Sequence, residues 1–406
     1  MISALRMGFR NLARSPGRTG LSLLAVSFGV VAVIMAGGFI EWAYWAMREA
    51  AIQSGLGHLQ ISGTGFREHG AADPYGHLLP EDDPRLAALR ANPEVRDVAP
   101  RLLFAGLASR GDATVSFIGE GVDPAAEEQV SRVLAVTAGR NLSPTAPDEV
   151  VLGQGLAAAL GVGVGDRVVL LVRTPAGGMN ALELTVRGLI TREIKAYDNA
   201  AVRMPLETAR RLTRARGTHL WVVRLERTDQ TGPVAARLRQ PLSASGLELA
   251  TWTELSAYYR SAVALFSRQL LVIELIIGTI IVLSMSNVLV MSVLERTGEV
   301  GTMMAMGNRR RDVVGLFMAE GLLLGLAGGI LGAIAGIALA HAVSAVGIPM
   351  PPPPGRSAGY RAEILVTAGL VVEGVTLAVA CAMAATAYPS WKAARLDIVD
   401  ALRRIR

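Results

Sequence analysis

Residues 295–311 read Glu-Arg-Thr-Gly-Glu-Val-Gly-Thr-Met-Met-Ala-Met-Gly-Asn-Arg-Arg-Arg and lie between two long apolar runs. Charged side chains are costly in the hydrocarbon core of a bilayer, so this segment belongs at a membrane surface. Its composition permits a helix, and three adjacent arginines end it. We therefore expect a short surface helix that is well placed to receive force from a cytoplasmic partner.

The composition of the whole chain predicts membrane spans around this segment. Hydrophobic residues make up 51% of the 406 residues and charged residues only 18%. A helix that crosses the bilayer needs about 20 mostly apolar residues. Four runs are long enough, at residues 21–40, 270–294, 313–346 and 364–388. The stretch between the first two runs has ordinary soluble composition and is long enough to form a core of its own.

The fold class that follows is an α-helical membrane protein with four transmembrane helices and a large extracytoplasmic α+β domain inserted between helices 1 and 2. The expected boundaries run along the chain as follows: an amphipathic elbow helix at 1–18, transmembrane helix 1 at 19–41, the inserted domain at 42–266, transmembrane helix 2 at 267–294, a coupling segment at 295–312, transmembrane helix 3 at 313–346, a Pro-rich loop at 347–363, transmembrane helix 4 at 364–388 and a tail at 389–406.

The distribution of charge predicts the orientation. The segment before the first span, the segment 295–312 and the tail together carry 13 bases and 5 acids, whereas the insert carries 24 of each. Lys and Arg accumulate on the cytoplasmic side of membrane proteins, so both termini and the coupling segment are expected there, and the insert and the Pro-rich loop outside. The bases are divided among three short membrane-flanking segments, which argues against nucleic-acid binding.

The insert alternates strand and helix patterns and is expected to form two subdomains. A ferredoxin-like part comes from both ends of the insert and a more β-rich part from its middle. Strands are expected at 57–62, 101–109, 114–119, 149–152, 167–173, 184–190 and 219–226, and helices at 83–91, 125–134, 155–160, 206–213 and 234–242. Gly111-Asp112 between two of these strands predicts a hairpin.

Thr251-Trp-Thr-Glu254 has the pattern of a capping box. No strong helix breaker follows it before the second apolar run, so we expect a stalk, one helix that continues from the extracytoplasmic domain into the membrane.

Glycines at spacing four mark the third apolar run. Such rows allow two helix backbones to approach closely. Five of them are expected to be packing positions: Gly321, Gly325, Gly329, Gly332 and Gly336. The row is either a seam to a second chain or a contact within this one, and the sequence leaves both alternatives open.

The motifs of catalysis are missing from the printed sequence. No Gly-x-x-x-x-Gly-Lys-Ser/Thr loop occurs, so the chain is not expected to bind ATP itself. The five histidines show no metal-ligand spacing with Cys or carboxylates, and we expect neither a metal site nor a catalytic residue. Glu274, Glu320 and Glu373 lie within the apolar runs. Glu274 and Glu320 fall near the expected membrane interfaces, where hydrogen bonds to neighbouring helices are favoured. Glu373 is nearest the middle of the membrane and is the best candidate for a functional acid, but no second acid or base pairs with it in the sequence, which argues against a proton relay.

The arrangement of one span, an extracytoplasmic α+β insert and three further spans resembles the MacB/FtsX/Lol-type permeases of ABC systems, with a MacB-like periplasmic core domain and an FtsX-like transmembrane domain. Four parts of the chain carry the resemblance: Arg10-Asn-Leu-Ala-Arg14 with Arg18-Thr-Gly-Leu-Ser-Leu-Leu, Glu149-Val-Val-Leu-Gly-Gln-Gly-Leu-Ala with Leu160-Gly-Val-Gly-Val-Gly-Asp166, Glu295-Arg-Thr-Gly-Glu-Val-Gly301 with Ala305-Met-Gly307, and Tyr388-Pro-Ser-Trp-Lys-Ala-Ala-Arg395 with Asp400-Ala-Leu-Arg403. The third is the most specific.

The resemblance implies a non-catalytic permease subunit in the bacterial inner membrane that moves its periplasmic domain when a separate ATPase binds and hydrolyses ATP. The partners implied are a cytoplasmic ABC ATPase dimer that binds ATP and Mg²⁺, a second permease copy or paralogue, a periplasmic carrier or adaptor, and the lipid bilayer. Lipoprotein or another amphipathic molecule is the expected cargo. The alternatives are an FtsX-like signalling scaffold that activates a periplasmic partner, and a drug or peptide efflux permease.

The residues expected to couple to the ATPase all lie in the third stretch: Glu295, Arg296, Thr297, Glu299, Gly301, Ala305 and Gly307. Glu295, Arg296 and Glu299 are expected to be polar contacts to the ATPase. Gly301 and Gly307 are expected to permit close approach or to end the helix.

Overall fold

The computed structural model describes residues 16–70, 72–130, 135–191, 195–350 and 360–395, together with Met7, Arg10 and Arg14. Contacts divide the chain into a helical unit, Met1–Trp45, Ala262–Met350 and Tyr360–Arg406, and a sheet unit, Ala46–Ser261 and Pro351–Gly359. The predicted elbow helix lies almost entirely outside the described residues, as do most of the Pro-rich loop and the end of the tail.

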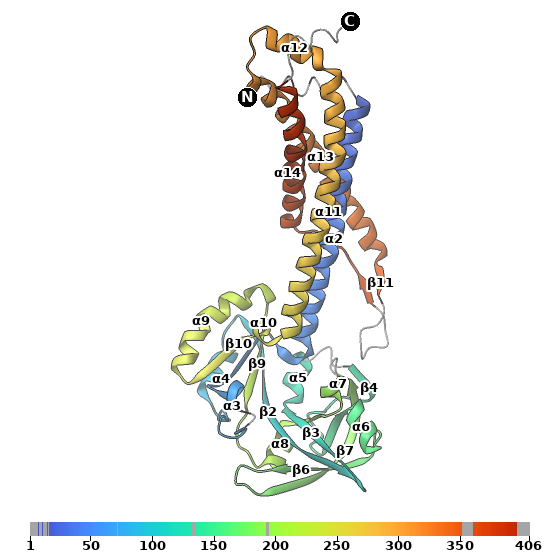
Figure 1. Cartoon of the computed structure of the whole chain (residues 1–406). Helices are drawn as coiled ribbons and strands as arrows, with labels where there is room; N and C mark the ends of the chain where they lie inside the picture. The colour runs from blue at the N-terminus through green and yellow to red at the C-terminus, as the bar shows by residue number, and fades with distance from the viewer. Residues whose placement is uncertain are drawn as a thin grey trace. The chain divides into compact units, whose positions relative to one another are not determined.

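Among the residues that the structure describes, four long helices are apolar enough to cross a membrane (Figure 1). They are α2 (Pro16–Ala51), which continues into the π-helical turn η1 (Ile52–Leu56), α11 (Ala257–Glu295), α13 (Arg310–Val346) and α14 (Ala368–Ala393). The short helix α12 (Thr297–Ala305) lies between α11 and α13, and two short antiparallel strands, β11 (Ile348–Met350) and β12 (Tyr360–Ala362), lie between α13 and α14. The described residues thus contain four candidate transmembrane helices, with an α/β domain between the first and the other three.

Apolar side chains from all four long helices meet in one cluster in the helical unit. Val26 and Ile34 of α2 contribute to it, as do Met285 of α11, Leu324 of α13 and Ala382 of α14. Many of its members are small, which lets the helices pack closely.

The described residues of the sheet unit form one ten-stranded sheet. Its strands are β1 (Leu59–Gly63), β2 (Val95–Arg110), β3 (Ala113–Val122), β4 (Ala135–Gly139), β5 (Glu149–Gly153), β6 (Arg167–Arg173), β7 (Met179–Thr191), β8 (Ala201–Pro205), β9 (Leu220–Leu225) and β10 (Leu247–Thr251). Its helices are α3 (Phe66–His69), α4 (Pro84–Arg90), α5 (Pro124–Val130), α6 (Gln154–Leu160), α7 (Lys195–Asp198), α8 (Leu206–Thr213), η2 (Thr228–Gln230), α9 (Thr231–Ala244) and α10 (Trp252–Leu255). The strand order is β10-β1-β9-β2-β3-β8-β5-β7-β4, and β6 pairs with β2 and β7.

The two ends of the insert form a ferredoxin-like βαββαβ arrangement, as the sequence predicts. Strands β10, β1, β9 and β2 lie in the order 4-1-3-2 of that motif, and every neighbouring pair is antiparallel. Helices α4 and α9 supply Leu86, Leu89 and Val234 to the core on one face of these strands. Helix α5 covers part of the opposite face, where Val130 joins Ala99 and Val222.

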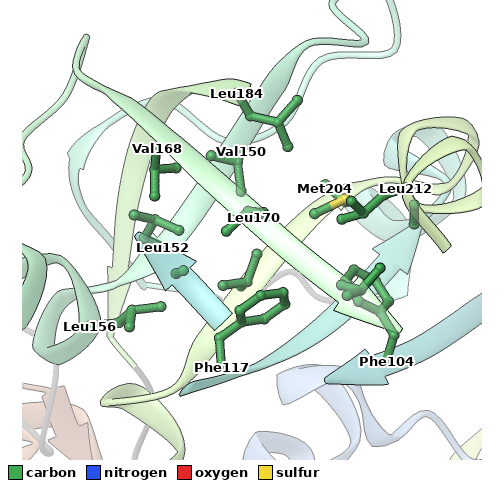
Figure 2. Close-up of a cluster of buried hydrophobic side chains, with 14 of the residues drawn as sticks. Phe104, Phe117, Val150, Leu152, Leu156, Val168, Leu170, Leu184, Met204 and Leu212 are labelled. Carbon is green, nitrogen blue, oxygen red and sulfur yellow. The ribbon is translucent and has the colours of Figure 1, made fainter. Parts of the chain in front are cut away.

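The middle of the insert has its own core (Figure 2). Phe104 of β2 and Phe117 of β3 meet edge to face, with ring centroids 5.9 Å apart. Leu170 of β6 and Met204 of β8 are fully buried in the same cluster. The long strand β2 therefore contributes to both cores, and the two predicted subdomains share one continuous sheet.

A network of charged side chains is buried where β2, β3, α5 and β8 meet. Arg203 of β8 is 2% exposed and donates to Glu127 at 2.6 Å and to Glu120 at 3.0 Å. Arg101 of β2 pairs with the same Glu127. Because buried charges persist only when they are paired, each member of this network depends on the others.

The expected stalk helix is present as α11, which runs unbroken from Ala257 to Glu295, but it does not begin at the capping box, and this corrects that part of the sequence-based prediction. The capping box is present, since Thr251 Oγ1 accepts from the Glu254 N–H and the Glu254 carboxylate accepts from the Thr251 N–H. The helix that it opens, α10, nevertheless ends at Leu255, and Ser256 takes a non-helical conformation before α11 begins. The Arg260 guanidinium donates to the carbonyls of Thr253 and Glu254, which stabilises this break.

Candidate functional site

Helix α12 is bounded by two changes of backbone direction. Arg296 separates it from α11 with φ −99° and ψ 13°. At its other end Gly307 has φ +96°, a conformation that favours glycine, so the helix stops there. Helix α13 then begins with its own cap, in which the Asp312 carboxylate accepts from the Arg309 N–H at 2.9 Å. The segment is therefore a defined helix between two turns.

The inner face of α12 packs against the ends of three long helices. Val300 of α12 is buried in a cluster with Val293 of α11, Phe317 of α13 and Ala393 of α14. The half-buried Met303 and Met304 pack against the same cluster. Burial of these side chains holds α12 in one position on the helical unit.

An ion pair strengthens this attachment. Arg296 donates to Glu320 of α13 at 3.0 Å, and the Glu320 side chain is only 3% exposed. Arg296 also lies 3.2 Å from Glu299 of α12. A buried carboxylate that loses its partner strongly destabilises a protein. This pair therefore fixes the start of α12 to the third turn of α13, where Glu320 lies.

Two arginines at the start of the chain meet the acids of this segment. Arg18 of α2 pairs with Glu295 at the end of α11. Arg14 lies 3.9 Å from Glu299, with both side chains largely exposed. Exposed pairs of this kind contribute about 0–1 kcal/mol each. They orient the acids rather than hold the segment in place.

The structure divides the seven predicted coupling residues into two groups. Thr297 and Gly301 are buried, and Arg296 is engaged within the chain. Thr297 Oγ1 donates to the Leu294 carbonyl at 2.7 Å. The exposed members are Glu295, Glu299, Ala305 and Gly307. Direct contact with a partner is therefore available to these four, while Arg296, Thr297 and Gly301 position the helix.

Exposed residues that the sequence analysis did not single out complete the outer face. Thr302 is exposed on α12, and Met306, which caps its end, is 74% exposed. Asn308 is exposed as well, and so are the three adjacent arginines already noted at the end of the segment. An exposed methionine suits a protein contact because its side chain adapts to the opposing surface. Glu299, Thr302 and Met306 are spaced by three and four residues, so they lie on one face of α12. Their place on the outer face can be inferred from the sequence only once the inner face is known.

The five predicted packing glycines of α13 each face another helix of the same chain. Gly321 lies against Thr386 of α14, and Gly325 and Gly329 lie against the same helix. Gly332 and Gly336 lie against α2, where a Cβ on Gly332 would come within 2.7 Å of the Ser27 carbonyl. Contact within the chain therefore accounts for the whole row.

The intramembrane acids differ in their surroundings. Glu320 has the partner described above, as expected for an acid that bonds to a neighbouring segment. Glu274 of α11 has one carboxylate oxygen that is buried without a hydrogen-bond partner among the described residues. Glu373 of α14 is exposed on the helical unit. Within the described part of the chain, no group of three or more His, Cys, Asp and Glu is arranged to hold a metal ion.

Two family models match the chain. Residues 19–240 match the model for the MacB-like periplasmic core domain, and residues 271–398 match the model for the FtsX-like permease C-terminal region. The first model alone spans more than half of the chain.

Curated relatives match over nearly the whole length. The lipoprotein-releasing system transmembrane protein LolC of Neisseria meningitidis is 26% identical over 409 residues, which covers 95% of this chain and 94% of that protein. LolC of Xylella fastidiosa strain Temecula1 is 24% identical and covers 94% and 92%. The macrolide export ATP-binding/permease protein MacB of Bdellovibrio bacteriovorus is 24% identical and covers 99% of this chain but 62% of its own length.

Solved domains of similar proteins align more weakly. The periplasmic region of MacB from Actinobacillus actinomycetemcomitans aligns at 12% identity with a TM-score of 0.38, over 52% of this chain and 95% of that domain.

Proposed function

This chain belongs to the family of the MacB-like periplasmic core domain and is an ABC transporter permease of the LolC, MacB and FtsX type, and we propose that it couples ATP hydrolysis by a separate cytoplasmic ATPase to movement of its periplasmic domain. It is an inner-membrane protein. In the proposal both termini and α12 lie in the cytoplasm and the sheet unit lies in the periplasm.

The construction of α12 is the observation that supports coupling. Its inner face is held by a buried cluster and by the Arg296–Glu320 pair, while its outer face presents Glu299, Thr302 and Met306. A helix that is fixed to the ends of α11 and α13 passes a push on its outer face directly to them. In the proposal the separate ATPase binds ATP and Mg²⁺ and hydrolyses the ATP, and this chain contributes the contacts and the movement.

Lipoprotein is the proposed cargo, with release from the inner membrane as the proposed step. Relatives named for a lipoprotein-releasing system match more than nine tenths of the chain and of their own length. Macrolide or peptide efflux is the second candidate, since a relative named for macrolide export also matches along the whole chain. A signalling scaffold remains an alternative outcome of the tests below.

The coupling proposal is tested by changing the outer face of α12. Met306→Glu places a charge on an exposed methionine without disturbing the buried cluster. We expect it to lower co-purification of the ATPase by about tenfold, because interface anchors of this kind often contribute more than 1 kcal/mol. Met179→Glu is the matched control, since Met179 is 60% exposed in the sheet unit. Equal ATPase recovery in both variants would contradict the proposal.

Two further measurements test orientation and cargo. In a Cys381→Ala background, Asn308→Cys should react with a membrane-impermeant thiol reagent only after the inner membrane is opened.

Depletion of the protein should cause lipoproteins to accumulate in the inner membrane. An unchanged lipoprotein distribution together with raised drug or peptide sensitivity would favour efflux instead.

A further inference from the structure

Exposed basic side chains gather where α13 begins and α14 ends. The two helix ends are in contact, because Val313 of α13 and Ala393 of α14 are buried in the same cluster. Five exposed bases lie within four residues of one or the other: Arg309, Arg310, Arg311, Lys392 and Arg395. We call these five residues the basic patch.

Other bases at this end of the helical unit are neutralised within the chain. Arg18 pairs with Glu295, and Arg296 pairs with the buried Glu320. The bases of the basic patch, in contrast, form no ion pair with any residue that the structure describes. Asp312 lies beside them, but its carboxylate accepts the backbone N–H of Arg309 and caps α13. The patch therefore has an excess of positive charge that this part of the chain does not neutralise.

Aromatic side chains place the patch at the depth of lipid headgroups. Tyr388 and Trp391 of α14 are 60% and 50% exposed and follow each other by about one helical turn. Exposed Tyr and Trp at the end of a membrane-spanning helix mark the boundary between hydrocarbon and headgroups. The Arg395 guanidinium lies 4.1 Å from the centre of the Trp391 ring, so its charge is held at that boundary.

This depth favours a lipid over a protein as the source of the neutralising anion. The phosphate groups of phospholipids lie just outside the hydrocarbon core, at the level of interfacial aromatic side chains. The surface proposed above to meet the ATPase, the outer face of α12, presents an acid, Glu299, and an apolar side chain, Met306. The bases beside Trp391 thus lie on a different part of the helical unit and have a different chemistry.

We propose that the basic patch binds anionic phospholipids of the cytoplasmic leaflet, with their phosphate groups at the start of α13 and the end of α14. Four of its five bases are arginines, whose planar guanidinium matches the oxygens of a phosphate. Each base near an anionic membrane surface strengthens the attachment by about fivefold, and added salt weakens it. The cluster that joins Val313 to Ala393 also holds Val300 of α12, so a lipid bound here stabilises the support of that helix.

The inference goes beyond the proposed function and rests on one part of it, the cytoplasmic location of α12 and of both termini. It does not rest on contact with an ATPase or on the identity of the cargo.

Thermal unfolding of the purified full-length protein in detergent, titrated with dioleoyl-phosphatidylglycerol, tests the patch. We expect this lipid to raise the melting temperature, and dioleoyl-phosphatidylcholine, whose headgroup has no net charge, to have little effect. Arg311→Gln combined with Lys392→Gln removes two charges and should raise the lipid concentration at half-maximal effect by about twentyfold. An equal response to the two lipids, or an unchanged midpoint in the double variant, would overturn the proposal.

Two measurements on the unaltered protein test the same claim without substitutions. Raising the salt concentration from about 0.05 M to about 0.5 M should weaken the response to phosphatidylglycerol, because screening acts on exposed charges. Inorganic phosphate without lipid should not reproduce the rise. A response that is insensitive to salt, or one that inorganic phosphate gives in full, would contradict the binding of a lipid headgroup.

Arg268→Gln combined with Arg361→Gln is the matched control. Both residues are exposed bases of the same helical unit, and they flank the opposite ends of its apolar runs. The control double variant loses the same net charge and should keep the midpoint of the unaltered protein. An equal shift in both double variants would attribute the effect to net charge and overturn the proposal.

Recovery of the ATPase separates this inference from the coupling proposal. If coupling through α12 is wrong, Met306→Glu retains the ATPase while the response to phosphatidylglycerol persists. If the lipid site is wrong, Arg311→Gln with Lys392→Gln responds to the lipid like the unaltered protein while Met306→Glu still loses the ATPase. Loss of the ATPase in the double variant with an unchanged lipid response would assign the patch to the ATPase and overturn the proposal.

Discussion

The sheet unit and the helical unit are each stabilised by a different kind of internal contact. Large side chains such as Trp221 and Phe117 fill the cores of the sheet unit, and a charge network is buried beside them. In the helical unit, glycines of α13 bring helix backbones close to α2 and α14. The sheet unit is therefore sensitive to lost side chains and lost charge partners, whereas the helical unit is sensitive to added atoms.

The largest expected effect comes from breaking the charge network of the sheet unit. Arg203→Met leaves Glu127 with one partner fewer and Glu120 without its Arg203 contact, in a site where Arg203 is 2% exposed. We expect the free energy of unfolding to fall by about 3–5 kcal/mol, the usual cost of breaking a buried ion pair.

Chemical denaturation of the purified full-length protein measures this change. Arg211→Met is the control, because Arg211 pairs with Asp148 at the surface and both side chains are more than half exposed. Exposed pairs contribute about 0–1 kcal/mol. Equal losses in the two variants would mean that the buried network contributes no more than a surface pair.

The next effect is a pH dependence that belongs to the sheet unit. His58 is buried, and burial, together with Arg224 and Arg48, lowers its pKa to about 4 from 6.5. Its Nδ1 accepts from the Leu225 N–H at 3.1 Å, a bond that the neutral ring can make. Between pH 6.5 and 4 the unfolded chain binds a proton that the folded chain does not. Stability should therefore fall by about 3 kcal/mol as pH drops through this window, and not depend on His58 above it.

Unfolding midpoints measured from pH 7 to pH 4 test this dependence. His58→Asn keeps a side-chain acceptor and should flatten the curve, whereas His69→Asn, at an exposed position, should not. A curve of unchanged slope in His58→Asn would assign the pH dependence to other groups.

A smaller steric effect is expected in the helical unit. The Cβ of Gly332→Val would approach the Ser27 carbonyl and Val30 Cβ at 2.7 Å, so α2 and α13 must separate. Overpacking of this kind costs about 1–3 kcal/mol. The melting temperature in detergent should fall for Gly332→Val but not for Gly315→Val, because a Cβ on Gly315 of the same helix meets no atom within 4 Å. A matching fall in both variants would point to helix propensity rather than to packing.

The smallest effect is expected at the exposed charges of the candidate site. Arg14→Gln removes the pair with Glu299, in which the side chains are 75% and 55% exposed. We expect a change of less than about 1 kcal/mol in stability, and a weak salt dependence. A large loss of stability in Arg14→Gln would show that this contact, and not the Arg296–Glu320 pair, holds α12 in place.

Local patterns in the sequence were sufficient for much of the fold. The four long apolar runs correspond to α2, α11, α13 and α14, and Gly111-Asp112 joins β2 to β3 as expected. The capping box at Thr251 is present as well. These features depend on residues that are neighbours in the chain, so composition and spacing contain the information.

The missed elements depend on distant partners. Strand β8 is buried throughout, but Arg203 at its centre breaks the run of hydrophobic residues by which a buried strand is recognised in a sequence. Arginine is seldom buried unless it is paired, so the sequence does not predict a buried strand here. Its partner Glu120 lies 83 residues away along the chain. The short strands β4 and β10 were missed too, and Ser256 ends α10 although no helix breaker stands there.

At the candidate site the same division holds. The sequence by itself located the segment between two spans and its glycine stop, because charge, apolar length and glycine are local properties. Only the tertiary structure decided that Arg296 pairs with Glu320, that Thr297 and Gly301 face inward, and that Thr302 and Met306 face outward. Which side of a short helix is buried depends on the helices packed against it, and those contacts join residues that the linear pattern keeps apart.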